Sequence, residues 1–270
     1  MDSLRLFDSH CHLDDARFDE DRDRMIQALP AQGLAYCLTV GSDLDSSRRS
    51  LQLAHQYPFI YAAAGVHPHE AAKAPVDYLL QVRELLGQKK VVALGEIGLD
   101  YHYDFSPRDV QRRVLMEQLD LAYELSMPVI VHVREAHGDM IDLLRDRADR
   151  LPGGVLHCFS GSAESAQEYV RLGFYISFAG PVTFKNAGKL LAAAQAVPLE
   201  KLLIETDSPY LSPVPLRGKR NTPAHVRHVC ERLAELRDLS AEDMAGITCR
   251  NAMALFGIDD SSRAQAVSAL

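Results

Sequence analysis

The sequence lacks any apolar run of the roughly 18 residues that a membrane-spanning helix needs. Its first residues also lack the basic stretch and the apolar segment of a secretory signal peptide. Cysteine is scarce: five are present, an odd number, and no two of them form a CxxC pair. These absences argue against a membrane protein and against a disulfide-linked secreted protein. We therefore expect a cytoplasmic protein with reduced thiols.

The chain also lacks an excess of positive charge. Its 29 lysines and arginines are outnumbered by 37 aspartates and glutamates, and the formal net charge is −8. A protein that binds nucleic acid along a broad basic face carries the opposite balance. A polyanionic substrate would therefore need local positive charge, from bound metal ions and from a short basic segment such as residues 217–220.

What the sequence does contain is a repeating order of short apolar runs and helical segments. Eight runs rich in Val, Ile, Leu and aromatic residues cover 4–8, 35–40, 59–66, 91–97, 128–133, 154–159, 174–180 and 201–207. Each is followed by turn residues, and helical segments alternate with the runs. In a chain near the typical ~250 residues, this order predicts an α/β fold, a single-domain (β/α)8 TIM barrel over residues 1–258, with a frayed tail over 259–270. An open doubly wound sheet is the alternative, and it is disfavoured because no GxGxxG follows the first run.

Several helix boundaries follow from local signals. Ser106 and Pro107 predict the N-cap and the first residue of a helix. Two closing helices are expected after the last strand, over residues 222–237 and 240–256. Ser240 begins the second of these and resembles the start of a capping box.

Titratable side chains recur where the predicted strands end, at His10, His12, His67, Glu96, His132, His157 and Asp207. Because catalytic groups of a TIM barrel lie at the carboxyl ends of the strands, we expect all of them on one rim. Residues i and i+2 of an extended segment point to the same side, so both His10 and His12 would face the barrel mouth. Imidazole is the commonest ligand of first-row metals. We therefore predict two metal ions that share a bridging carboxylate.

Each of these residues also has a structural explanation when it is taken singly. A histidine at a strand end is commonly a hydrogen-bonded structural residue. Glu96 would be a buried carboxylate paired with a lysine, and Asp207 would be the N-cap of the following turn. Taken together the structural explanation fails, because burying many titratable groups without an ion is costly. The other histidines, with His69 the least certain, are expected at the surface, and Cys158 is expected to pack in the core. The acidic residues 14–23 predict a solvent-exposed first helix.

The motifs in combination resemble the TatD family of metal-dependent hydrolases and deoxyribonucleases, within the amidohydrolase-type barrels. The segments FDSHCHLD, GVHPH, GEIGLDY, PVIVHVREA, HCFSGS, ETDSPYL and RGKRN stand in the order found in the family. The resemblance implies a TIM barrel with two metal sites. The first site would be made by His10, His12, Glu96 and Asp207, and the second by Glu96, His132 and His157.

The resemblance also implies an activity, the removal of nucleotides from the 3′ end of single-stranded DNA. Glu96 would bridge the ions, Asp207 would orient or deprotonate the attacking water, and His67 would face the scissile phosphate. The phosphate contacts expected beyond these are Arg134, Arg217 and Lys219. The protein is expected to act on DNA ends as a monomer, with no membrane partner.

The donor set of imidazoles and carboxylates fits Zn, Mn or Co better than Mg. It leaves two alternative functions open. One is an amidohydrolase or esterase acting on a small molecule or an aminoacyl-tRNA, since a metal polarises a carbonyl as well as a phosphoryl oxygen. The other is a metal-dependent binding protein without turnover, whose stability would rise with metal concentration.

Overall fold

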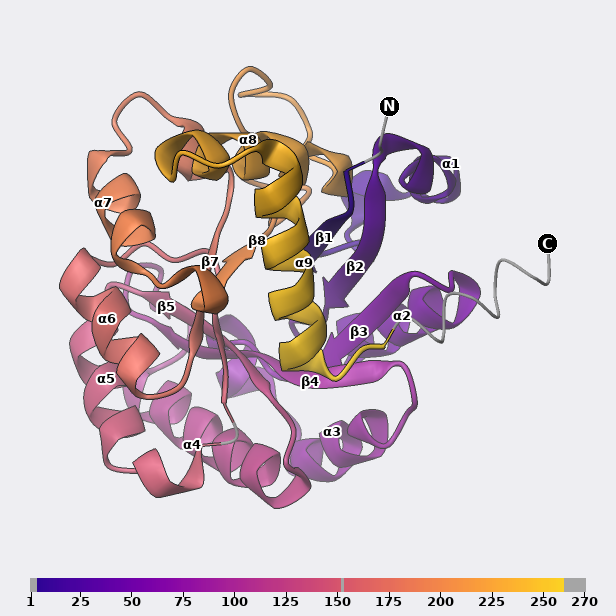
Figure 1. The fold of residues 1–270 in the computed structure, drawn as a ribbon. Coiled ribbons are helices and arrows are strands. Elements are labelled where there is room, and N and C mark those ends of the chain that lie inside the picture. Colours follow the sequence, from indigo (N-terminus) through magenta and orange to yellow (C-terminus); the bar gives the residue numbers. More distant parts are fainter. Residues whose placement is uncertain (1–3, 152, 260–270) are drawn as a thin grey trace.

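The computed structural model describes residues 4–151 and 153–259, so the predicted tail lies outside the described residues from residue 260 on. Eight strands pair in parallel, each with the next along the chain. They are β1 (Leu6–Cys11), β2 (Leu34–Val40), β3 (Ile60–Ala64), β4 (Val91–Asp100), β5 (Val129–Arg134), β6 (Gly154–Leu156), β7 (Tyr175–Phe178) and β8 (Leu202–Ile204). The predicted single-domain α/β barrel of eight parallel strands is confirmed (Figure 1).

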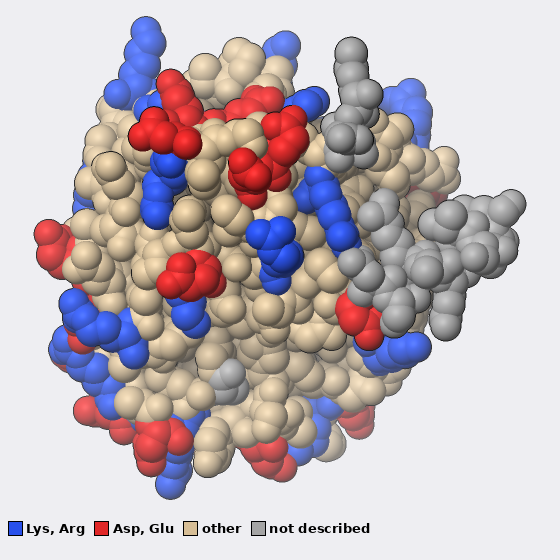
Figure 2. All heavy atoms as spheres, in the orientation of Figure 1, with Lys and Arg blue, Asp and Glu red and all other residues tan. Residues whose placement is uncertain are grey.

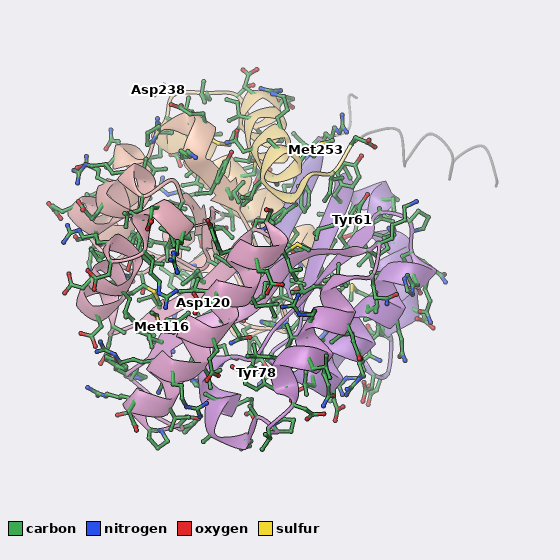
Figure 3. The ribbon with its side chains drawn as sticks, turned by 90° about the horizontal axis from the view of Figure 1, so that it is seen from below. Tyr61, Tyr78, Met116, Asp120, Asp238 and Met253 are labelled. Atoms are coloured by element: carbon green, nitrogen blue, oxygen red, sulfur yellow. The ribbon has the colours of Figure 1, made fainter. Side chains whose placement is uncertain are left out.

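Helices surround these strands and connect one to the next (Figure 1). They are α1 (Arg22–Ala28), α2 (Leu44–Gln56), α3 (Tyr78–Leu86), α4 (Arg108–Leu125), α5 (His137–Arg145), α6 (Ala163–Arg171), α7 (Gly188–Ala196), α8 (Val226–Leu236) and α9 (Ala241–Phe256). Figure 3 shows them from below, with Met116 and Asp120 on α4 and Tyr78 on α3. None of the helices within residues 4–151 and 153–259 combines the length and the apolar character needed to cross a lipid bilayer.

The core has two layers because successive strand residues point to opposite faces of the barrel wall. The residues between strands and helices form the larger buried cluster. A smaller cluster fills the barrel near the amino ends of the strands and includes Phe7, Tyr36 and Ile130. Phe256 at the end of α9 packs on Phe7, with ring centroids 6.2 Å apart. Apolar packing thus fills this end of the barrel, and the polar residues lie at the carboxyl ends of the strands.

Side chains of β1 join the first strand to the segment that follows β8. The carboxylate of Asp8 accepts hydrogen bonds from the amide and the hydroxyl of Thr206. Burial raises the pKa of Asp8 well above its ordinary value, against the effect of these hydrogen bonds. The amide of Asp207 donates to the carbonyl of His10 at 2.9 Å, and the amide of His12 donates to the carbonyl of Ser208 at 2.7 Å. Closure of the barrel therefore brings the first strand, β1, next to the segment after the last strand, β8, and places His10 and His12 beside Asp207.

Local details of three predicted helices differ from expectation. Helix α4 begins at Arg108 rather than at Pro107, and Ser106 does not cap it. The Ser106 hydroxyl instead donates to the His69 carbonyl and accepts from the Ala72 amide, so tertiary contacts outweigh its capping preference.

The predicted acidic helix is wrong for most of its length, because α1 begins at Arg22 and Asp14 is buried, accepting hydrogen bonds from Ser46 and Arg49. The two closing helices are present. The first begins with a 3-10 turn, Pro223–His225, before α8. Ser240 caps α9 as predicted, accepting from the Asp243 amide.

Candidate metal centre

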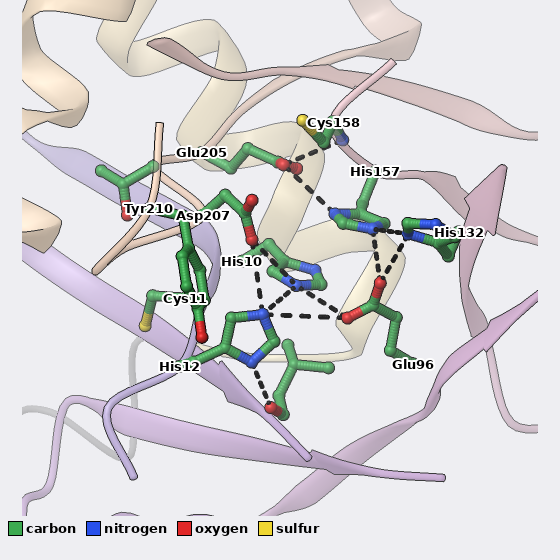
Figure 4. A network of polar contacts seen from close by, with 12 residues as sticks. His10, Cys11, His12, Glu96, His132, His157, Cys158, Glu205, Asp207 and Tyr210 are labelled. Atoms are coloured by element: carbon green, nitrogen blue, oxygen red, sulfur yellow. Dashed lines mark hydrogen bonds and ion pairs between the residues drawn. The ribbon is translucent and has the colours of Figure 1, made fainter. Parts of the chain in front are cut away.

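Five of the side chains predicted from the strand ends gather around Glu96 at one end of the barrel (Figure 4), namely His10, His12, His132, His157 and Asp207. His67 also contacts Glu96. A cavity of about 1020 Å³ opens onto them and is lined by His12, His67, Glu96, His132, His157 and Asp207, among others. His10 lies beneath this lining and is fully buried. The structure thus brings all the predicted metal ligands and His67 into one cluster.

One group of candidate ligand atoms surrounds Oε2 of Glu96 and the imidazoles of His10 and His12. His10 Nε2 lies 3.3 Å from His12 Nε2 and 3.4 Å from Glu96 Oε2. Asp207 Oδ1 lies 3.3 Å from His12 Nε2 and 3.9 Å from His10 Nε2. Ligands about 2.0–2.1 Å from a zinc ion stand about 3.4 Å apart at the corners of a tetrahedron. His10, His12 and Glu96 are therefore close enough together to bind one divalent ion, and Asp207 lies next to the two histidines as a fourth candidate ligand.

A second group surrounds the other oxygen of Glu96. His157 Nε2, His132 Nδ1 and His67 Nε2 lie 2.7, 3.0 and 3.3 Å from Glu96 Oε1. The shortest of these is a charge-assisted hydrogen-bond distance, so this group is drawn more tightly together than the first. Each Glu96 oxygen faces one group, which is the arrangement that a bridging carboxylate requires.

Hydrogen bonds on the far side of each ring indicate which nitrogen is free to bind a metal. His12 Nδ1 donates to the Val40 carbonyl at 2.9 Å, so its Nε2 lone pair points into the cluster. His132 and His157 have carboxylates at their far nitrogens, Asp100 and Glu205. These three histidines thus keep an acceptor at the far nitrogen, so that the nitrogen facing the cluster can offer a lone pair once a metal ion displaces its proton.

His67 has the opposite arrangement. Its Nδ1 accepts a hydrogen bond from the His69 amide at 3.1 Å, so its proton lies on Nε2, the atom that faces Glu96. Burial lowers the pKa of His67 to about 4, which keeps this ring neutral at pH 7. A neutral N–H donor suits a contact with a substrate oxygen rather than a metal bond.

The charges of the cluster favour ionised carboxylates. Burial would raise the pKa of Glu96, but the surrounding histidines, His157 first, outweigh it and hold that pKa well below its usual range. Burial disfavours the charged form of His12 and would lower its pKa. The hydrogen bond and the negative charge of Asp207 outweigh burial and raise the pKa of His12 to about 9. The metal-free cluster therefore carries protons that a bound ion would displace, since metal ligands must be deprotonated.

Two carboxylates of this site were missed by sequence reasoning. Asp100 Oδ2 lies 3.1 Å from His132 Nε2 and 2.8 Å from His69 Nε2. Glu205 Oε1 accepts from the Cys158 amide at 2.8 Å and lies 3.3 Å from His157 Nδ1. Both had a readable signal, because Asp100 is two positions past Gly98 in the same alternation as Glu96, and Glu205 precedes Asp207 by two residues.

Two further predictions concerned residues near the rim. His69 is not a surface residue, because Asp100 holds it at the wall of the cavity. Cys158 also lines the cavity instead of packing in the core. Strand β6 ends at Leu156, and Cys158 has a positive φ of 43°, so strand alternation does not reach it.

The predicted phosphate contacts lie in different places. Arg134 lines the cavity, with its guanidinium 4.7 Å from the centre of the Tyr103 ring. Arg217 and Lys219 are exposed residues of the segment between β8 and α8, and they are not part of the cavity lining. Arg217 lies over the ring of Phe184 at 4.1 Å. The structure thus brings one of the three cations to the cluster.

A model of the family described as TatD related DNase matches residues 7–257. The chain belongs to this family. Among TatD family relatives, an uncharacterized metal-dependent hydrolase of Bacillus subtilis, YabD, is 44% identical over 94% of this chain and 100% of its own length. The 3′-5′ ssDNA/RNA exonuclease TatD of Escherichia coli K12 is 40% identical over 94% of this chain and 99% of its own.

A solved TatD family structure agrees with the fold. The E. coli K12 TatD homologue YJJV superimposes with a TM-score of 0.88 at 34% identity, over 95% of this chain and 99% of the other. Family membership and the buried cluster of His, Glu and Asp together make this protein a metal-dependent hydrolase of the TatD family.

Proposed function

We propose that this TatD family hydrolase is a two-metal exonuclease that removes nucleotides from the 3′ end of single-stranded DNA. The observation that carries the proposal is the difference between the histidines around Glu96. His12, His132 and His157 each have an acceptor at the far nitrogen, which leaves the near nitrogen for a metal, whereas His67 accepts at its far nitrogen and presents an N–H donor from the cavity wall. A phosphate oxygen is the acceptor that such a donor beside two cation sites would meet. The relative named as a 3′-5′ ssDNA/RNA exonuclease supports the same substrate class.

Each residue then has a defined task. The two groups around Glu96 would hold two divalent ions, which would lower the pKa of the attacking water and would neutralise charge on the phosphate. Asp207, which is ionised and is the fourth candidate ligand of the first group, accepts the proton of the attacking water through its carboxylate. His67 Nε2 donates a hydrogen bond to a non-bridging phosphate oxygen. The new P–O bond comes from water, and the bond to the 3′ oxygen of the preceding nucleotide breaks; this oxygen takes up a proton from solvent, which leaves a shortened strand with a 3′-hydroxyl and releases a 5′-mononucleotide.

The charge of the protein is compatible with this substrate. Acidic and basic side chains are interspersed over the face drawn in Figure 2. The bound ions would supply the positive charge at the cluster, because a divalent ion is the largest local charge in such a site. The cavity of about 1020 Å³ lies at or above the usual upper limit for a small-molecule site, which leaves room for a strand end.

The test compares single-stranded DNA and RNA oligonucleotides, labelled at the 3′ or the 5′ end, with metal-reconstituted protein. We expect a ladder that starts at the 3′ end, needs divalent metal and is lost in Asp207→Asn. Asp139→Asn is the matched control, because Asp139 is a partly exposed carboxylate paired with Arg112 outside this cluster. Metal-loaded protein that cleaves no oligonucleotide, or an Asp207→Asn variant that cleaves as well as wild type, would refute the proposal.

A further inference from the structure

Two large aromatic side chains are exposed in the loop between β4 and α4. Tyr103 and Phe105 have 48% and 67% of their surfaces exposed. Their rings stack, with centroids 5.3 Å apart and planes 24° from parallel. Tyr103 also lines the cavity above the metal cluster. Exposed apolar residues are ordinary when they are single, but a stacked pair at the edge of a candidate active site calls for an explanation.

The pair is held firmly against the metal centre. His69 packs edge-on against both rings, with centroids 5.4 Å from Tyr103 and 4.8 Å from Phe105. Asp100 binds His69 Nε2 through Oδ2, and its Oδ1 accepts the Tyr103 amide at 2.8 Å. The same Oδ2 lies 3.1 Å from Nε2 of His132, a candidate metal ligand. One carboxylate therefore fixes both the aromatic pair and a ligand, so the distance between them is set by the fold.

A cation stands beside the aromatic pair. The guanidinium of Arg134 lies 4.7 Å from the Tyr103 centroid and lines the same cavity. Aromatic faces next to a cationic group are the common device for holding single-stranded nucleic acid, because every base offers a π-face and every nucleotide a phosphate. The combination matches a nucleotide better than it matches a small apolar ligand.

We propose that Tyr103 and Phe105 form a nucleobase subsite for a nucleotide adjacent to the scissile bond, with Arg134 binding the phosphate of that nucleotide. This inference rests on the proposed exonuclease function. The base stacks on the exposed aromatic surface and positions the strand end over Glu96. Stacking reads no base edge, so the subsite accepts all bases and rejects an abasic nucleotide.

The binding test uses oligonucleotides carrying 2-aminopurine at one of the last few 3′ positions, with phosphorothioate linkages that resist cleavage. Stacking on the wild-type protein is expected to quench the fluorescence at one position. Tyr103→Ala with Phe105→Ala should weaken binding about tenfold or more, from the stacking free energy of one base. Tyr103→Phe should bind as wild type, because stacking needs the ring and not the hydroxyl.

Tyr123→Ala is the matched control, since Tyr123 is 49% exposed on α4 and lies outside the cavity lining. It should leave binding and cleavage unchanged. A second readout compares kcat/KM for oligonucleotides with an intact and an abasic nucleotide at the quenched position. Wild type should prefer the intact substrate, and the double variant should lose this preference by about the same factor of ten.

The outcomes separate the subsite from the proposed function. Cleavage by wild type with equal binding by the double variant would overturn the subsite and leave the exonuclease standing. Weakened binding in the double variant of a protein that cleaves no oligonucleotide would support the subsite and overturn the exonuclease. Wild type that binds no oligonucleotide would overturn both.

Discussion

Replacing Asp100 with asparagine should weaken metal binding by the candidate ligand His132, although the side chain at position 100 keeps nearly the same shape. Asp100 Oδ1 accepts two amide hydrogen bonds, from His102 at 3.0 Å and Tyr103 at 2.8 Å. In Asp100→Asn the amide oxygen must therefore stay at the Oδ1 position, and the NH₂ group takes the Oδ2 position. There it faces Nε2 of His132 and donates to it, which moves the ring proton to Nδ1. His132 Nδ1 is the atom that faces Glu96, so this tautomer cannot bind a metal.

The expected loss follows from the hydrogen bonds at this contact. For His132 to bind metal in the variant, its proton must stay on Nε2, where it would face the NH₂ group of the new side chain. Two N–H donors would then face each other where His132 Nε2 and Asp100 Oδ2 are now hydrogen-bonded at 3.1 Å. A buried unsatisfied donor costs about 1–3 kcal/mol, which corresponds to about a 5–150-fold loss in metal affinity. This range includes the 10–100-fold loss that is typical when a partner of a ligating histidine is removed.

Glu205→Gln is the informative comparison, because its geometry predicts a smaller effect. Oε1 of Glu205 accepts the Cys158 amide and faces His157 Nδ1, whereas its Oε2 has no hydrogen-bond partner within the described part of the chain. A glutamine can place its oxygen at Oε1 and keep the tautomer of His157 unchanged, with NH₂ at the Oε2 position. Glu205→Gln therefore removes a negative charge but leaves the Nε2 lone pair of His157 available for a metal.

The assay is competition of each metal-free protein with a chromogenic zinc chelator, with the circular dichroism spectrum as a check on folding. Asp100→Asn should bind zinc at least five times more weakly than wild type, and Glu205→Gln should lie between the two. Equal affinity of Asp100→Asn and wild type would refute the tautomer argument. So would an equal loss in both variants, because loss of a negative charge alone would then explain it.

Three other measurements follow from the structure. Adding divalent metal at 100 times its dissociation constant should stabilise the protein by about 2.7 kcal/mol, read as a rise in Tm, and an unchanged Tm would contradict metal binding to the folded state. Phe256→Ala should destabilise the fold by about 3–5 kcal/mol in urea unfolding, because it empties the packed end of the barrel beside Phe7. Arg134→Ala should raise KM for single-stranded DNA and flatten its salt dependence more than Arg217→Ala does, since only Arg134 of these two lines the cavity, and the reverse order would show that the segment after β8 binds the strand.

The sequence predicted the barrel and the cluster because both depend on local patterns. Apolar runs mark strands, and a histidine or carboxylate at the end of a run marks the rim, so His10 and Glu96 were assigned without any knowledge of contacts. Helix boundaries were less predictable. Ser106 has the local signal of an N-cap, but its hydroxyl is engaged by the loop after β3, far away in the sequence.

Alternation could place Asp100 on the side of Glu96, but the histidine that it contacts could not be predicted from a local pattern. Asp100 was an unremarked residue of GEIGLDY, and its role depends on the pairing of β4 with β5, which places Gly98 opposite His132. The two strands approach each other closely at this point, because a Cβ on Gly98 would lie 1.9 Å from the His132 carbonyl oxygen. The φ of Gly98 is 152°. Such a contact between strands is set by register, which a single sequence does not reveal.

The metal centre therefore depends on the closed barrel more than on any one motif. The HxH segment brings His10 and His12 to the rim, but the His12 lone pair is aimed by the Val40 carbonyl at the end of β2. The lone pair of His132 is aimed from β4 and that of His157 from the residue after β8. Each of these three histidines is thus oriented by a residue of another strand or of the segment that follows one. A fragment that kept every motif but left the barrel open would lose these acceptors, and its imidazoles would bind metal as freely rotating groups do, without a fixed tautomer.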